Sequence, residues 1–139
     1  MKRRNFFSKS LPASIAALGI PALLKAKPAN PQSPAMNGNF IHVVYFWLKD
    51  PASSENSDQL LQGIKGYLGE IDVILDSFIG TPAQTPREVV DNSYSFSIIL
   101  TFANRADQDV YQAHPSHLKF IEESGHLWER VQVYDSLRV

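Results

Sequence analysis

The sequence has 139 residues, 44% of them hydrophobic, and contains no cysteine. This size fits one globular domain with a tail, and the lack of cysteine excludes disulfides, thiolate chemistry and cysteine-based zinc sites. The net charge of −1 hides an asymmetry, because six of the 13 Lys and Arg residues lie before Asn30 whereas all 14 Asp and Glu residues follow it. The part after Asn30 therefore carries seven cations and 14 anions. Such an acidic domain opposes binding to a phosphate backbone, so we expect no nucleic-acid partner.

The first 35 residues have the pattern of an export signal. A basic start leads into a mostly apolar run, residues 11–24, which is too short to span a bilayer as a stable helix. Prolines and a glycine in this run disfavour the alternative, an amphipathic helix. The Arg-Arg-Asn-Phe-Phe stretch at residues 3–7 resembles a twin-arginine signal. We therefore expect residues 1–35 to form an export signal and the start of a linker, residues 36–39 to complete the linker, and the mature protein to be periplasmic with no membrane attachment.

The folded part, residues 40–139, is predicted to begin with a strand at residues 40–48. These residues are β-branched or aromatic, and both alternating sets are largely apolar, which is typical of a strand buried on both faces. One set consists of His42, Val44, Phe46 and Leu48, and the other of Ile41, Val43, Tyr45 and Trp47.

A helix and two further strands are predicted next. Leucine and isoleucine recur at helical spacing across residues 57–71, where three glycines lower the intrinsic stability of the helix. Residues 73–80 indicate a second strand, and residues 81–92, with two prolines, indicate a loop. Strict alternation predicts a third strand at residues 93–102. Its apolar face would carry Tyr94, Phe96, Ile98, Leu100 and Phe102.

Two helical segments and a last strand complete the predicted domain. Residues 104–113 favour a helix, residues 115–123 its continuation after a break, and residues 128–137 a strand. The resulting β-α-β-β-α-β order is the ferredoxin-like α+β plan, a single antiparallel sheet with helices on one face. Because helices can cover only one face, the apolar set that begins with Ile41 predicts an interface on the other. We therefore expect a homodimer joined through that face.

The stretch with most chemistry is residues 111–120, which place a phenol and two imidazoles around a helix start. Proline is tolerated at the first helical position, so Pro115 indicates the start, with His114 at the cap and His117 in the first turn. There the unpaired N–H groups and the helix dipole disfavour an imidazolium, and a neutral His117 can act as a base. Two alternatives remain open: the histidines satisfy caps or buried polar groups, or His114 and His117 bind a metal, although the motif offers no cysteine or carboxylate to complete the set.

The pattern Tyr-x-x-His-Pro-x-His-x-x-Phe at residues 111–120, together with His42 on the first strand, resembles the stress-responsive dimeric α/β-barrel family. This family includes proteins similar to olivetolic acid cyclase, a plant polyketide cyclase. The resemblance runs from about Phe40 to Leu137. It implies that two protomers pack their sheets face to face into a dimeric α/β barrel. It also implies a small apolar cavity between sheet and helices that works without metal or cofactor.

The resemblance further implies roles for individual residues. His117 would remove a proton from an acidic carbon between carbonyls, Tyr111 would hydrogen-bond the developing enolate oxygen, and His42 would orient the ligand or another group. A second tyrosine of the plant enzyme aligns with Ile64, and Tyr67 lies three residues further on. The other residues expected to line the cavity are Val44, Phe46, Phe96, Ile98, Leu100, Ile64 and His114.

Two classes of function are compatible with this pattern. The first is a cofactor-free lyase or cyclase acting on a small carbonyl or phenolic compound. The second is a non-catalytic dimer that binds a small apolar or aromatic ligand or protects against stress. A haem-degrading or oxygen-using enzyme of the same barrel plan is a weaker third alternative, because nothing singles out one of the four histidines as an axial ligand. If the site is catalytic, we expect His117 to titrate below a free histidine, since burial and the helix start oppose its charge.

Overall fold

The structure, a computed structural model, describes residues 36–139, so the expected export signal at residues 1–35 lies outside the described residues. A short 3-10 turn, η1 (Gly125–Leu127), joins the last helix to the last strand. The main elements follow in the order β1 (Phe40–Leu48), α1 (Ser54–Leu68), β2 (Asp76–Gly80), β3 (Phe96–Phe102), α2 (Arg105–Ala113), α3 (Pro115–Ser124) and β4 (Trp128–Leu137).

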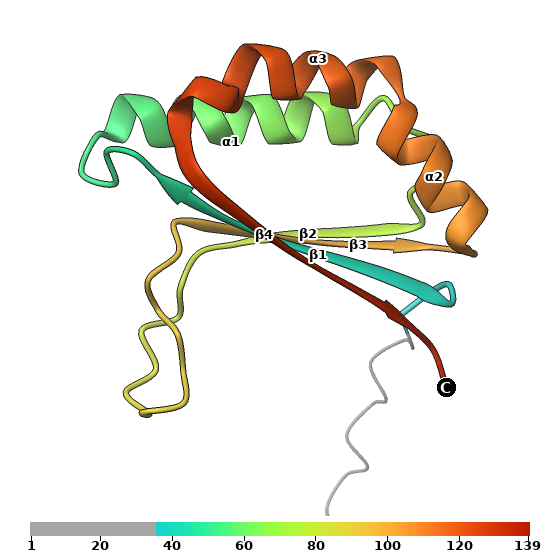
Figure 1. Ribbon diagram of the computed structural model, residues 1–139, viewed down its shortest axis with the longest axis horizontal. Coiled ribbons are helices and arrows are strands. Elements are labelled where there is room, and N and C mark those ends of the chain that lie inside the picture. The colour runs from blue at the N-terminus through green and yellow to red at the C-terminus, as the bar shows by residue number, and fades with distance from the viewer. Residues whose placement is uncertain (1–35) are drawn as a thin grey trace, which may run out of the picture. The chain divides into compact units, whose positions relative to one another are not determined.

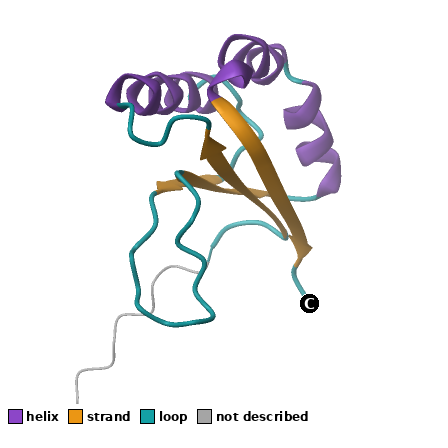
Figure 2. Ribbon diagram, turned by 60° about the vertical axis from the view of Figure 1, so that its left-hand side comes forward, coloured by secondary structure: helices purple, strands orange, loops and turns teal. Residues whose placement is uncertain are grey.

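The four strands form one antiparallel sheet with the order β2-β3-β1-β4. All three α-helices lie on the same face of this sheet, whereas the long connection between β2 and β3 extends on the opposite side (Figures 1 and 2). The structure thus has the predicted ferredoxin-like α+β plan. None of the helices within residues 36–139 has the length and apolar content needed to cross a bilayer.

The two faces of β1 have different environments. The set that includes His42 and Phe46 faces the helices and is buried, whereas the set that includes Val43 and Tyr45 is only partly buried. The apolar faces of the helices cover the first set, with Tyr111 of α2 against His42 and Phe120 of α3 against Phe46. The core formed in this way consists of Phe40, Val44, Phe46, Leu48, Leu60, Ile64, Tyr67, Ile71, Phe96, Ile98, Leu100, Phe102, Tyr111, Phe120 and Leu127.

The first helix begins three residues before the predicted start at residue 57. The hydroxyl of Ser53 accepts a hydrogen bond from the backbone N–H of Asn56 at 3.2 Å, which caps the helix amino terminus. The helix ends at Leu68, and Gly69 follows as its carboxyl-terminal cap. The predicted second strand also shrinks from residues 73–80 to β2, because the chain first turns with a bond from the N–H of Ile74 to the carbonyl of Ile71.

The predicted third strand, residues 93–102, starts three residues late in the structure. Its apolar alternation holds from Phe96 onward, but Tyr94 lies before the strand and does not share that face. The Tyr94 ring instead packs against Tyr45, on the opposite face of the sheet, with ring centroids 4.8 Å apart. A bond from the N–H of Ser95 to the carbonyl of Phe46 at 2.7 Å anchors the chain at this change of direction.

Part of the predicted linker, residues 36–39, is held against the sheet. The guanidinium of Arg138 donates to the carbonyl oxygens of Met36 and Gly38, at 2.8 and 3.2 Å, and the N–H of Asn37 donates to Asp76. Gly38 has a φ of +89°, and a Cβ there would lie 2.2 Å from the carbonyl oxygen of Phe102. Only glycine fits this turn, so the ordered domain includes the residues directly before β1.

Alanine substitutions at two glycines of α1 should change the stability of the fold in opposite directions. A Cβ on Gly66 would meet no atom within 4 Å, so Gly66→Ala should stabilise the fold by up to about 1 kcal/mol through helix propensity alone. A Cβ on Gly63 would lie 2.9 Å from the Ser124 hydroxyl and 3.1 Å from the Phe120 ring. Gly63→Ala should therefore destabilise the fold by about 1–3 kcal/mol. Urea unfolding of both variants checks the pair, and equal shifts would contradict the close packing of α1 on α3.

Candidate functional site

The break between α2 and α3 determines how the two helical histidines are used. Pro115 has no N–H, and the N–H of Ser116 donates to Nδ1 of His114 at 3.2 Å, so His114 caps α3. The carbonyl of Gln112, in the last turn of α2, is consequently left without its usual helical donor four residues on. This unpaired carbonyl oxygen becomes the partner of a side chain.

His117 supplies that partner. Its Nδ1 lies 3.2 Å from the Gln112 carbonyl oxygen, and because a carbonyl can only accept, Nδ1 carries the proton. The neutral ring therefore presents an unprotonated Nε2, the atom that can accept a proton from a ligand. The His117 ring also packs 4.5 Å, centroid to centroid, from the ring of Tyr111.

The second imidazole of the site comes from the sheet. His42 is buried on the helix-facing side of β1, directly opposite Asp135 in the pairing of β1 with β4. Its Nδ1 lies 2.6 Å from a carboxylate oxygen of Asp135, so Nδ1 donates to this carboxylate and Nε2 is left for a ligand. The ring of Tyr111 covers His42 in an edge-on arrangement at 5.5 Å between centroids.

Two tyrosines meet above the sheet. The hydroxyl of Tyr67, from the last turn of α1, lies 3.2 Å from the hydroxyl of Tyr111, from α2, and either can be the donor. When one hydroxyl donates to the other, the accepting oxygen keeps its own proton for a further bond. The pair can therefore present one O–H donor to a bound oxygen atom.

Burial sets the protonation of these groups at neutral pH. It lowers the pKa of His117, and the neighbouring His42 and His114 add to the effect, while the bond to the Gln112 carbonyl opposes it. Burial raises the pKa of Tyr67, with the Tyr111 hydroxyl adding to the rise. It also raises the pKa of Tyr111 to about 12. A neutral imidazole and two protonated phenols thus lie together.

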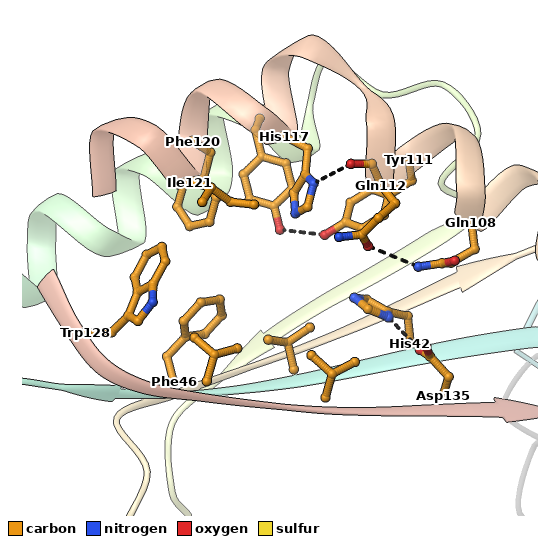
Figure 3. A pocket seen from close by; sticks show the side chains of 14 residues that line it. His42, Phe46, Gln108, Tyr111, Gln112, His117, Phe120, Ile121, Trp128 and Asp135 are labelled. Atoms are coloured by element: carbon orange, nitrogen blue, oxygen red, sulfur yellow. Dashed lines mark hydrogen bonds and ion pairs between the residues drawn. The ribbon is translucent and has the colours of Figure 1, made fainter. Parts of the chain in front are cut away.

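These side chains surround a cavity of about 410 Å³ between the sheet and the helices. One end is aromatic, with the Trp128 ring 5.2 Å from Phe46 and 5.6 Å from Phe120, centroid to centroid. Figure 3 shows this end opposite the polar end, where Gln108 and Asp135 lie. The full lining is His42, Val44, Phe46, Tyr67, Gln108, Tyr111, Gln112, His117, Phe120, Ile121, Trp128, Val131, Val133 and Asp135.

Not all residues expected to line the cavity do so. His42, Tyr111, His117, Val44 and Phe46 are among its lining residues. The remainder are not, because the cavity lies over β1 and β4, whereas the expected residues of β3 and α1 belong to the packed core and His114 caps α3. The expected residues outside the lining are Phe96, Ile98, Leu100, Ile64 and His114.

Several lining residues were not expected from the sequence. Asp135 is the most consequential, and its place follows from the register of β4, in which Val131, Val133 and Asp135 alternate on one face. Tyr67 occupies the place on α1 facing Tyr111, while Ile64, one turn earlier, is fully buried in the core. The alternation of residues 128–137 predicts that Asp135 faces the helices. It does not predict that Asp135 lies beside His42.

The metal alternative finds no matching geometry in the described part of the chain. Within residues 36–139, no three His, Asp or Glu side chains are grouped so that they could hold a metal ion. His114 and His117 each use Nδ1 in a bond to the local backbone, and only His117 lines the cavity. The two imidazoles three residues apart therefore serve different purposes.

Solved structures share this fold. A Dabb family protein with a ferredoxin-like fold from Mesorhizobium loti is 23% identical, with a TM-score of 0.62 over 74% of this chain and 99% of its own. The hydroxynitrile lyase from Passiflora edulis is 19% identical, with a TM-score of 0.63 over 73% of this chain and 94% of its own. A dimeric protein with a ferredoxin-like fold from Bacteroides fragilis is 22% identical, with a TM-score of 0.57 over 73% of this chain and 97% of its own.

Comparison at the level of sequence also identifies a family, although a search of curated proteins found no match. The sequence model named Stress responsive A/B Barrel Domain, or Dabb, matches residues 40–137, which is more than half of the chain and includes every residue of the cavity described above. The chain therefore belongs to the stress-responsive A/B barrel domain family.

Proposed function

We propose that this protein is a cofactor-free lyase or cyclase that moves a proton on a small carbonyl or phenolic compound. The observation that carries the proposal is the convergence of two imidazoles and a tyrosine pair on one half-open, largely apolar cavity. Titratable groups with shifted pKa values in a cavity are typical of acid–base sites. Hydrogen bonds to the Asp135 carboxylate and to the Gln112 carbonyl fix the tautomers of the His42 and His117 rings, respectively.

His117 is the base in the proposed reaction. Its Nε2 takes the proton from a carbon next to a carbonyl, and the electron pair of the broken C–H bond moves onto the carbonyl oxygen. The Tyr111 hydroxyl, held by Tyr67, donates a hydrogen bond to that oxygen as its negative charge develops. Both phenols stay protonated, because their raised pKa values make them poor acids at neutral pH.

His42 orients the ligand from the opposite wall. Asp135 fixes the ring through Nδ1, so Nε2 can bond to a second oxygen or hydroxyl of the ligand. Two imidazoles on different elements thereby bracket the reacting carbon, one from β1 and one from α3. This arrangement suits a compound with two neighbouring oxygen functions.

The shape of the cavity supports a compound with an apolar or aromatic part. Phe46, Phe120 and Trp128 form an aromatic wall at the end remote from Asp135, where an aryl or alkyl group would be desolvated. One protein of the same fold is named a hydroxynitrile lyase, which supports a lyase on this scaffold. The alternative is a non-catalytic binding or stress-protective dimer, in which the same polar groups only satisfy one another.

The pH dependence of deuterium exchange at an acidic carbon distinguishes the catalytic proposal from the non-catalytic alternative. A suitable compound is ethyl 2-benzoylpropanoate, which has an aryl group and one acidic hydrogen between two carbonyls. The enzyme-dependent rate of deuterium exchange should rise with pH through the lowered pKa of His117, because only the neutral ring accepts the proton. The midpoint of this rise should lie below the pH of about 6.5 at which a free histidine titrates. NMR measures the rate, and binding without any enzyme-dependent exchange would favour the non-catalytic alternative.

We further propose that the protein is a homodimer joined through the sheet face without helices. That face carries the partly buried Val43, Tyr45 and Trp47 of β1, and the exposed Phe78 and Tyr134 of the two edge strands. An apolar face of this kind is costly in water. Structural neighbours described as dimeric support the proposal. Two such faces packed together would form the α/β barrel.

We also propose that the protein is exported to the periplasm by the twin-arginine-type signal at residues 3–7. The basic start and short apolar run support the proposal. Mass spectrometry of the protein from its native host should find a mature chain that begins near residue 36. Recovery of the full-length chain from the periplasm would contradict signal removal, and recovery from the cytoplasm would contradict export.

A further inference from the structure

A second cavity adjoins the polar end of the first. It has a volume of about 420 Å³ and is lined by residues of β1, α2 and the end of β4. Gln108 and Asp135 line both cavities, so they form the boundary between the two spaces. A ligand that occupies both spaces would therefore have to pass between Gln108 and Asp135 to reach the amino-terminal end of α2. The complete lining of the second cavity is Phe40, Arg105, Gln108, Asp135, Ser136 and Leu137.

Arg105 is the only cationic side chain among the residues that line the two cavities. It forms no ion pair within residues 36–139, although these residues carry twice as many acidic as basic side chains. Arginine presents a planar set of donors that matches a carboxylate. Arg105 is itself exposed, with the buried Phe40 and the exposed Leu137 lining the same cavity.

The polar residues follow one stripe of α2. Arg105, Gln108 and Gln112 are spaced by three and four residues, so they lie on the same side of the helix. Tyr111 adjoins the end of this stripe, and its Cα lies about 9 Å along the helix axis from that of Arg105, at a rise of 1.5 Å per residue. An acid group at Arg105 would thus lie several bonds away from a carbonyl at Tyr111.

The carboxylate of Asp135 does not prevent a second anion from binding. One of its oxygens is bonded to Nδ1 of His42 at 2.6 Å, and the side chain is 45% exposed, so solvent screens its charge. Gln108 lies between the two spaces and donates from Nε2 to Gln112 at 3.2 Å. Its amide oxygen remains to accept from a ligand group on the way to Arg105.

We propose that the second cavity is a subsite for a carboxylate, and that Arg105 binds it. The proposal rests on the proposed function, and it narrows the substrate class to keto acids with an aryl or alkyl end. The apolar end would lie against Phe46 and Trp128, the carbonyl at Tyr111 and His117, and the acid beyond Gln108. Figure 3 shows the first two of these regions and the boundary residues in this order.

The test compares two compounds that differ only in charge. These are 6-oxo-6-phenylhexanoate and its primary amide, whose binding to the full-length chain is measured by calorimetry. The acid should bind more tightly than the amide. Arg105→Gln should weaken acid binding by about 2- to 5-fold, the range expected for an ion pair with an exposed arginine, and should leave amide binding unchanged. Arg87→Gln is the matched control, since it removes the same charge from an exposed loop residue.

Two results would overturn the subsite. One is equal affinity of the wild-type protein for acid and amide, and the other is an equal loss of acid binding in the Arg105 and Arg87 variants. The outcome is separable from that of the proposed function. Charge-dependent binding that needs Arg105, without any enzyme-dependent exchange on ethyl 2-benzoylpropanoate, would leave the subsite in place and remove the catalytic proposal.

Discussion

Replacing His117 with alanine is expected to slow deuterium exchange on ethyl 2-benzoylpropanoate by about 10²- to 10⁴-fold, the usual contribution of a general base. The lowered pKa keeps the wild-type ring neutral at pH 7, with its free Nε2 in the cavity. Among the described residues that line the cavity, His117 is the only imidazole carried by a helix. NMR measurement of the exchange rate at pH 7, with saturating protein, checks the result.

The control for this variant is His126→Ala. His126 is exposed in η1 and does not line the cavity, so its loss should leave exchange unchanged. Circular dichroism and thermal unfolding of both variants establish that the fold persists. Near-wild-type exchange by a folded His117→Ala protein would contradict the assigned base, and Asp135→Asn would then test whether His42 carries the reaction instead.

In the proposed homodimer, replacing Val43 with aspartate is expected to separate the two protomers. Val43 lies at the centre of β1, on the sheet face that the helices leave uncovered. Two copies packed through this face would each bury an unpaired carboxylate, at a cost of several kcal/mol per ion. Light scattering at a concentration where the wild-type protein is dimeric measures the change.

The matched control places the same substitution on the helix side. Val110 is 52% exposed on α2, so Val110→Asp should leave the dimer intact. A Val43→Asp protein that remains dimeric would contradict the choice of face. Dissociation of both variants would indicate general destabilisation, which unfolding curves of each protein would then reveal.

Local patterns predicted most of the fold. The alternation of β1 and the spacing of α1 depend on neighbours in the chain, and the break at Pro115 follows from a missing N–H, so each can be read without tertiary knowledge. Errors occurred at element ends. Tyr94 continued an alternating pattern, yet its ring lies on the other face, because the chain changes direction at Ser95 before pairing begins.

The site was predicted less completely, because two of its contacts join distant parts of the chain. The bond between His42 and Asp135 depends on the register of β1 with β4, and the bond between Tyr67 and Tyr111 depends on how α1 packs beside α2. Neither register nor packing is encoded by local spacing. The lowered pKa of His117 agrees with the sequence-based expectation, and its largest cause is burial, as expected. The other lowering effects come from the neighbouring His42 and His114 rather than from the helix start.

The bond between His42 and Asp135 spans 93 positions of the chain. Contacts of such separation form late in folding, because a long loop must close before they gain any free energy. The first and last strands of the domain must therefore already be joined when one side of the cavity is completed. A partly folded chain can contain all three α-helices and still lack this wall. Ligand binding is therefore a stricter test of complete folding than helical content is.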